Sequence, residues 1–171
     1  MKTYDEEYHS FVVARYRTLI RAAMLFGCTR PDAEDAVQDA LVRCYAAWPR
    51  VVAADDRDAY VYRVLVNGIS RSWRRRWRRE VPLPEVPETS LADPAVGIVL
   101  HQSVRAALER LDPGQRQVLV LRYFSDLSEA QISEVLGIRP GTVKSRAARA
   151  IAVLGLDPAL TELNPTPEEN R

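Results

Sequence analysis

The side chains best suited to chemistry lie near the C-terminus, where basic and hydroxyl residues recur at helical spacing. A stripe of Val143, Ala147, Ala150 and Leu154 predicts a helix with one buried face over residues 141–154. Arginine can donate paired hydrogen bonds to guanine in a major groove, and lysine, serine and threonine reach phosphates or bases. We therefore expect a DNA-binding surface made of Arg139, Thr142, Lys144, Ser145, Arg146 and Arg149.

A second basic surface is predicted in residues 59–79, which contain seven arginines and no acid. On a helix, one set of polar side chains falls within an arc of about 80°, opposite an apolar stripe. Repulsion along such a surface destabilises the free helix, so a polyanion is its natural partner. Trp77 could stack on unpaired bases, as aromatic residues do in single-strand binders, whereas Trp73 fits the core. The arc contains Tyr60, Arg63, Asn67, Arg71, Arg74 and Arg78, and these residues together with Trp77 are the expected DNA-binding set.

A third surface, in residues 32–39, is acidic and lies mainly opposite the apolar side of its helix. Helix dipoles favour acids in the first turn, which accounts for Asp32 and Glu34 but not for Asp39. A metal site would need further ligands, and no histidine or other acid converges on this segment. The surface instead suits a basic, partly apolar partner helix. Its residues are Asp32, Glu34, Asp35, Gln38 and Asp39.

Local start and stop signals place the C-terminal basic helix in a helix-turn-helix. Residues 112–115 combine an N-cap acid, a proline at the first helical position and a glutamine three residues after the acid. Residues 128–131 form a second capping box, which opens a short helix running to Leu136. Gly137 can then take the left-handed conformation that ends a helix. This pattern favours DNA binding over the alternative of an ordinary solvated helix.

Helical periodicity also dominates the N-terminal half. It predicts a helix ending near Gly27, a second helix from about Asp32 that Pro49 ends, and a third helix over residues 58–79. Residues 80–97 contain four prolines, four acids and no base, a composition typical of an extended linker. We expect an all-α protein of two small helical domains joined by a flexible linker. The predicted parts are domains 1–79 and 98–155, linker 80–97 and a disordered tail 156–171.

Three segments resemble the extracytoplasmic-function (group 4) sigma factors of the sigma-70 family. Residues 122–137 with 141–146 resemble their region 4, residues 32–39 resemble region 2.2, and residues 59–67 resemble regions 2.3 and 2.4. The chain departs from the family at Arg139, where a serine often caps the recognition helix, and at Tyr60, where the family typically has tryptophan. Both halves of the family pattern occur in the expected order.

The resemblance implies how the three surfaces work. In the family, region 4 reads the −35 promoter element and docks on the β flap of RNA polymerase. Region 2.2 binds the β′ clamp, while regions 2.3 and 2.4 melt and read the −10 element. The loop over residues 51–57 matches the place where the family pockets a base flipped from the non-template strand. Family members are often held inactive by an anti-sigma protein, which is therefore an expected partner alongside core polymerase and promoter DNA.

Other classes of protein fit the sequence less well. Cys28 and Cys44 are the only cysteines, and no CxxC or Cys/His cluster is present, so we expect buried thiols and neither metal nor cofactor. The acidic N-terminus lacks the apolar region of a signal peptide, and no apolar run would span a membrane, which predicts a cytoplasmic protein. One alternative is a stand-alone helix-turn-helix regulator that binds duplex DNA as a dimer. A metal-dependent nuclease or hydrolase is a more distant one.

Overall fold

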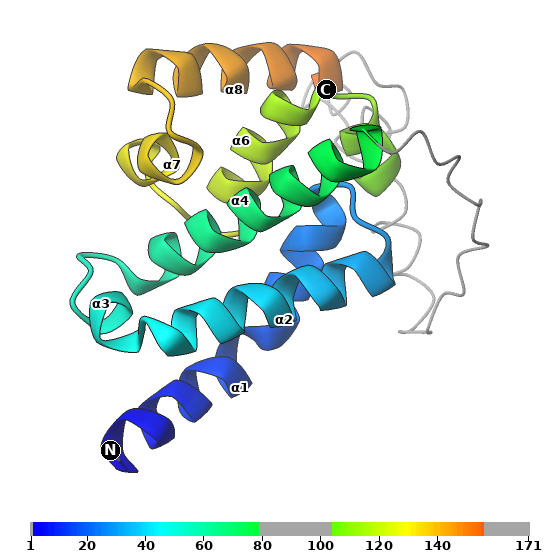
Figure 1. The fold of residues 1–171 in the computed structure, drawn as a ribbon. Coiled ribbons are helices and arrows are strands. Elements are labelled where there is room, and N and C mark those ends of the chain that lie inside the picture. The colour runs from blue at the N-terminus through cyan, green and yellow to red at the C-terminus, as the bar shows by residue number, and fades with distance from the viewer. Residues whose placement is uncertain (1, 79–103, 156–171) are drawn as a thin grey trace, which may run out of the picture.

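A computed structural model of the chain describes residues 2–78 and 104–155, which are helical throughout apart from short turns (Figure 1). None of these described residues forms a β-strand, as the all-α prediction required. A short helical stretch covers residues 104–109. The other helices are α1 (Lys2–Leu25), α2 (Arg30–Ala46), α3 (Trp48–Val52), α4 (Arg57–Arg78), α6 (Pro113–Tyr123), α7 (Glu129–Leu136) and α8 (Pro140–Gly155).

The N-terminal lobe consists of α1 to α4, with α2 packed against both α1 and α4. Its apolar stripes meet around fully buried side chains such as Phe26, Val37 and Leu65. Thr29 caps α2, because its hydroxyl accepts a hydrogen bond from the backbone N–H of Asp32 at 3.4 Å. The lobe therefore fixes two long helices, α2 and α4, whose polar faces point away from the shared core.

The prediction that Pro49 ends the second helix was wrong. That helix, α2, ends at Ala46, and Pro49 lies in the first turn of the separate short helix α3. A proline costs little there, because the first N–H groups of a helix have no partner within the helix. Trp48 and Val51 of α3 are buried, and the Trp48 ring packs edge-on against Tyr8 with the ring centres 5.2 Å apart. The proline thus marks a helix start that anchors the loop before α4.

In the C-terminal lobe, the predicted caps are confirmed. The Asp112 carboxylate accepts hydrogen bonds from the first N–H groups of α6, and Ser128 with Gln131 forms the capping box of α7. Gly137 ends α7 with φ +63°, the left-handed conformation that glycine adopts without steric cost. These signals produce the α7–turn–α8 arrangement, a helix-turn-helix whose second helix buries Val143, Ala147 and Ala150.

The two lobes pack directly against each other. Helix α7 packs against α4, α6 touches α1, and buried side chains of both lobes form one continuous core (Figure 1). We call this contact the seam. The predicted linker 80–97 and tail 156–171 lie outside the described residues. Sequence patterns predicted the two helical parts but contained no signal for the seam, which therefore needs its own explanation.

Candidate nucleic-acid interface

The basic surface of α4 has the predicted composition. Arg63, Asn67, Arg71 and Arg74 are exposed, Tyr60 is half-buried beside them, and the opposite side of the helix is buried. No acidic side chain among the described residues pairs with these arginines. Arg71 and Arg74 instead donate to the backbone oxygens of the residues four positions earlier, at 3.3 and 3.2 Å. The surface is therefore a row of uncompensated positive charge.

Trp73 lies partly buried against the core, in agreement with its predicted place on the apolar stripe. Trp77 and Arg78 belong to the last turn of α4, where the structure describes the backbone path and not the side chains. Their predicted contacts with the −10 strand lie outside what the structure describes.

The second basic surface, on α8, is more constrained by neighbouring residues. Arg139, Lys144 and Arg149 are exposed, whereas Thr142 and Ser145 are half-buried. Arg149 donates to the Ser145 backbone oxygen and hydroxyl, both at 3.2 Å, and the Lys144 ammonium lies 3.6 Å from the Glu129 carboxylate. These contacts orient the side chains before any ligand arrives.

Arg146 differs from the other predicted residues of α8. It is half-buried, and its guanidinium lies against Gly114 at the start of α6. A methyl group at Gly114 would stand 2.8 Å from an Arg146 nitrogen, closer than such atoms approach. Arg146 therefore packs α8 onto α6. The sequence holds one signal for this contact, namely a glycine in the first turn of a helix. Most residue types are tolerated at such a position, so a glycine there indicates that another group comes close.

The acidic surface of α2 divides into two parts. Asp32 accepts a hydrogen bond from the Thr29 hydroxyl at 2.8 Å, and Glu34 pairs with Arg30 at 3.0 Å, so both have partners within the first turn of the helix. Asp35, Gln38 and Asp39 are exposed. The open part of the surface is thus smaller than the predicted set and lies further along the helix.

Sequence reasoning missed one residue of this surface. Val42 is 67% exposed and follows Asp35 and Asp39 on the same side of α2 at helical spacing. An apolar side chain on a polar helix face was the signal that could have revealed it. Val42 gives the acidic surface an apolar end, which suits a partner helix that is itself partly apolar.

No other chemistry is evident in the described part of the chain. No group of three or more histidine, cysteine or acidic side chains there could hold a metal ion. Cys28 and Cys44 are buried, as predicted, and burial raises the pKa of the Cys44 thiol to about 11, which keeps it protonated. None of the described helices is long and apolar enough to cross a membrane.

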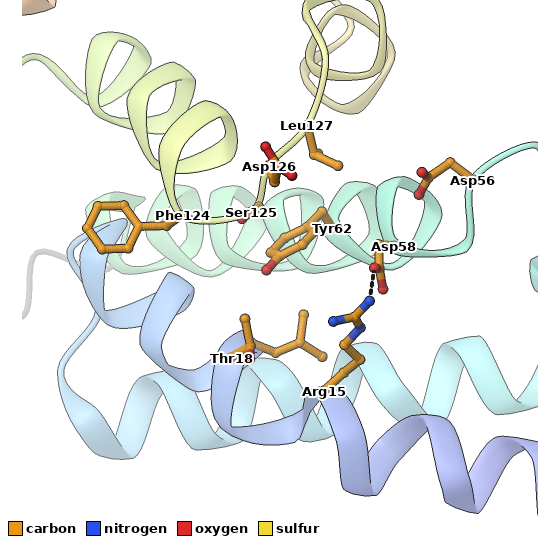
Figure 2. Close-up of a pocket in the computed structure, with 10 residues that line it drawn as sticks. Arg15, Thr18, Asp56, Asp58, Tyr62, Phe124, Ser125, Asp126 and Leu127 are labelled. Atoms are coloured by element: carbon orange, nitrogen blue, oxygen red, sulfur yellow. Dashed lines mark hydrogen bonds and ion pairs between the residues drawn. The ribbon is translucent and has the colours of Figure 1, made fainter.

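A cavity of about 310 Å³ lies at the seam (Figure 2). Arg15, Thr18 and Tyr62 line it from the N-terminal lobe, and the turn at residues 124–127 lines it from the other lobe. Burial raises the pKa of the Tyr62 hydroxyl, so this group stays neutral. Arg15 and Asp58 form an ion pair within the cavity wall. Because both lobes line the cavity, it exists only while they are in contact, and it does not resemble a ligand site built by one domain.

Comparison with known families gives matches to both lobes. The family model described as Sigma-70 region 2 matches residues 11–79, and the one described as Sigma-70, region 4 matches residues 101–154. The RNA polymerase sigma-E factor of Streptomyces avermitilis is 35% identical over 148 residues, which cover 86% of this chain and 83% of the relative. The ECF RNA polymerase sigma factor SigM of Mycobacterium tuberculosis is 33% identical, over 81% of this chain and 70% of the relative.

Two solved structures share the fold. The sigma factor RpoE of Bartonella quintana, in complex with the anti-sigma factor NepR, gives a TM-score of 0.75 at 23% identity and covers 87% of this chain and 94% of that one. CnrH, in complex with the cytosolic domain of CnrY, gives 0.65 at 24% identity, over 94% of this chain and 90% of that one.

Proposed function

We propose a division of labour between the three surfaces, starting from the fact that the chain belongs to the extracytoplasmic-function group of the sigma-70 family. As a member of that family it is a sigma factor, which binds core RNA polymerase and directs promoter-specific transcription initiation. The family is one of non-enzymatic transcription factors. The observation that carries the proposal is the presence of two exposed basic helix faces on separate lobes, together with an acidic face on a third helix.

We assign the −10 element to α4. Its exposed arginines can neutralise the phosphates of a melted strand, and Tyr60 and Asn67 can stack on or hydrogen-bond to unpaired bases. Trp77 and Arg78 would extend this surface by one helical turn. A row of unpaired cations binds a flexible single strand well, because it needs no fixed duplex geometry.

We assign the −35 element to α8. A helix-turn-helix places its second helix in the major groove, where the N-terminal residues of that helix contact base edges. Arg149 is held in position by Ser145, and Arg139 and Lys144 reach outwards to phosphates. Thr142 and Ser145 supply hydroxyls, and Arg146 supports α8 from beneath.

The polymerase contact is assigned to the exposed part of the α2 surface, where Asp35, Gln38, Asp39 and Val42 present acidic and apolar groups together. Asp32 and Glu34 support this surface from the first turn. Such a composition suits the β′ clamp helices. The C-terminal lobe would contact the β flap. An anti-sigma protein is a further expected partner, because RpoE of Bartonella quintana is seen in complex with the anti-sigma factor NepR. We also propose that the protein has no catalytic activity and acts in the cytoplasm.

Transcription from a promoter template with purified core polymerase tests the function. A stand-alone dimeric regulator would bind duplex DNA and yield no transcript of its own, and it would leave the acidic and α4 surfaces without a role. The sigma factor must bind core polymerase and start transcription at a fixed position. Duplex binding by the chain alone, with no association with core polymerase, would contradict the proposal.

A further inference from the structure

The seam holds the two promoter-binding lobes in contact. In this arrangement α4 and α8 lie too close together to reach both promoter elements at once. Promoter elements named −10 and −35 are about 25 base pairs apart, or about 85 Å along B-DNA. A compact body of about 130 residues has a radius of gyration of only about 14 Å. Helices α4 and α8 therefore cannot occupy both elements while α7 packs against α4. The packed arrangement is a state that must open before the chain works.

One polar contact at the seam involves a residue of the loop before α4. Gln131 of α7 donates from its side-chain nitrogen to an Asp56 carboxylate oxygen at 2.7 Å, across 75 residues of sequence. The other Asp56 oxygen accepts from the Ala59 backbone N–H at 2.6 Å and so caps α4. Asp56 belongs to the loop at residues 51–57, which the family resemblance assigns to the flipped promoter base. Both carboxylate oxygens are occupied while the seam is closed.

The other half of Gln131 has a local role. Its side-chain oxygen accepts from the Ser128 backbone N–H at 2.6 Å and completes the capping box of α7. The amide thus bonds through both of its ends, with its oxygen in its own helix and its nitrogen across the seam. A glutamate at this position would keep the cap, because glutamate is equally suited to a capping box. It would also place a carboxylate against the Asp56 carboxylate.

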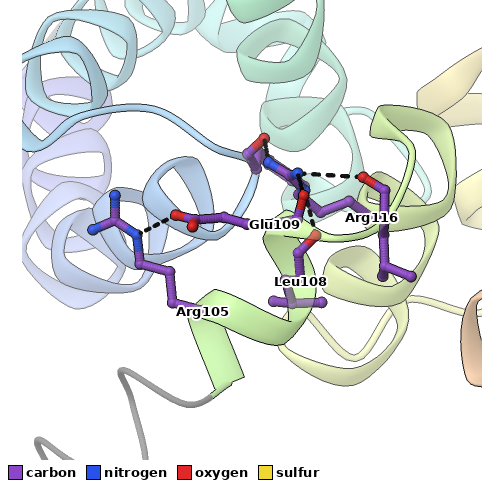
Figure 3. A network of polar contacts seen from close by, with 6 residues as sticks. Arg105, Leu108, Glu109 and Arg116 are labelled. Atoms are coloured by element: carbon purple, nitrogen blue, oxygen red, sulfur yellow. Dashed lines mark hydrogen bonds and ion pairs between the residues drawn. The ribbon is translucent and has the colours of Figure 1, made fainter. Parts of the chain in front are cut away.

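A second polar contact joins the lobes at the other end of the seam (Figure 3). Arg116 donates to the backbone oxygens of Leu108, Glu109 and Leu111 within its own lobe, and to that of Phe26 at the end of α1, at 3.4 Å. The adjacent Gly27, at φ +109°, leaves room for the guanidinium, which a methyl group there would approach to 2.5 Å. Three of the four acceptors remain when the lobes part, so this contact holds the seam less specifically than Gln131 does.

We propose that the Asp56–Gln131 hydrogen bond is a latch, which keeps the lobes closed and the 51–57 loop unavailable to promoter DNA until polymerase separates them. The latch rests on the proposed function, since it regulates access to the same two surfaces. The seam also buries apolar side chains, among them Tyr62 and Leu127, each about 5% exposed or less. Apolar contacts favour closure, and the hydrogen bond fixes which residues meet.

The test uses the full chain and three variants. Gln131→Glu replaces the donor by a charge that repels Asp56 while preserving the cap. Asp56→Asn added to Gln131→Glu restores a donor–acceptor pair with its direction reversed, and the asparagine oxygen still caps α4. Ala130→Glu is the matched control, because it adds the same charge to the same turn of α7 at an exposed position. The radius of gyration from solution scattering reports closure without any polymerase.

We expect Gln131→Glu to enlarge the radius of gyration and to increase the affinity for core polymerase about tenfold, the effect of one unfavourable buried polar contact. The double variant and Ala130→Glu should both match the wild type. An unchanged radius for Gln131→Glu, a double variant as open as the single one, or an open variant without tighter binding would each overturn the latch. If the wild type and all variants fail to support transcription, the proposed function fails, whatever the scattering shows, and the latch fails with it.

Discussion

The basic surfaces of α4 and α8 carry similar residues, but the side chains differ in whether they have partners within the protein. On α4, Arg63, Arg71 and Arg74 are exposed and have no acidic partner among the described residues. On α8, Arg149 is hydrogen-bonded to Ser145, and Lys144 lies close to Glu129. A row of arginines without side-chain partners suits a single strand whose shape adapts to the protein, whereas basic side chains oriented by neighbouring side chains suit a duplex of fixed geometry. The number of arginines alone would not have distinguished the two roles.

The largest expected effect is on α4. Replacing Arg63, Arg71 and Arg74 by alanine together should slow promoter opening roughly 100-fold, because each charged contact to the strand contributes at least about 1 kcal/mol. Binding of duplex −35 DNA should change little. Opening is measured by permanganate reactivity of unpaired thymines in the polymerase complex.

The control replaces the exposed Arg21, Arg43 and Arg50, which removes the same charge elsewhere on the lobe. If the control slows opening as much as the α4 variant, net charge and not the α4 surface is responsible. The proposed difference in role between α4 and α8 would then be wrong.

The next effect concerns the third surface and separates polymerase binding from DNA binding. Asp35→Asn with Asp39→Asn should weaken binding to core polymerase roughly 30-fold, since two charges facing a basic partner are lost at a cost of about 2 kcal/mol. Affinity for duplex DNA should stay the same. Fluorescence anisotropy of labelled protein with core enzyme gives the affinity, and Glu6→Gln is a control on an exposed acid of α1. Equal weakening by the control would argue against a defined docking surface.

On α8, Arg149→Ala should lower the affinity for a −35 duplex about tenfold, the usual range for a side chain that reads a base. Promoter opening, once the complex has formed, should be almost unaffected. Lys144→Ala is the matched comparison, and we expect a loss of only about threefold from a single phosphate contact, with a shallower salt dependence. Should Arg149→Ala slow opening more than it weakens duplex binding, the assigned roles of α4 and α8 would be reversed.

The smallest expected effect is on stability, and it concerns the turn at Gly137 that joins α7 to α8. Gly137→Ala places a side chain at φ +63°, which costs about 1 kcal/mol, and no neighbouring atom would clash with the added methyl group. Urea unfolding should show this loss. Gly141→Ala, in α8 and equally free of neighbours, is the control and should be neutral or slightly stabilising. Equal losses in both variants would remove the argument that the turn needs a left-handed residue.

Features encoded by neighbouring residues were predictable from the sequence. The caps at Asp112 and Ser128 and the turn at Gly137 depend on residues within four positions, and the structure confirms all three. Pro49 shows the limit of such local reasoning, because a proline serves equally well after one helix and at the start of the next.

Features that join distant segments were not predictable. Gln131 meets Asp56 across 75 residues, with no periodic pattern to reveal the contact. The glycine at position 114 indicates a close neighbour, but it does not indicate that this neighbour is Arg146. Helical periodicity shows which side of a helix is buried but not which helix covers it. For the same reason, the direct packing of α7 on α4 could not be foreseen, although each of these helices was.

Transcription in a purified system tests the central claim most directly. The full chain is mixed with core RNA polymerase and a template carrying a −10 and a −35 element selected by this protein from a random library. We predict a single promoter-dependent transcript that is absent when core polymerase is used alone and that is lost when either element is scrambled. Duplex binding without any association with core polymerase, or transcription that ignores both elements, would contradict the account.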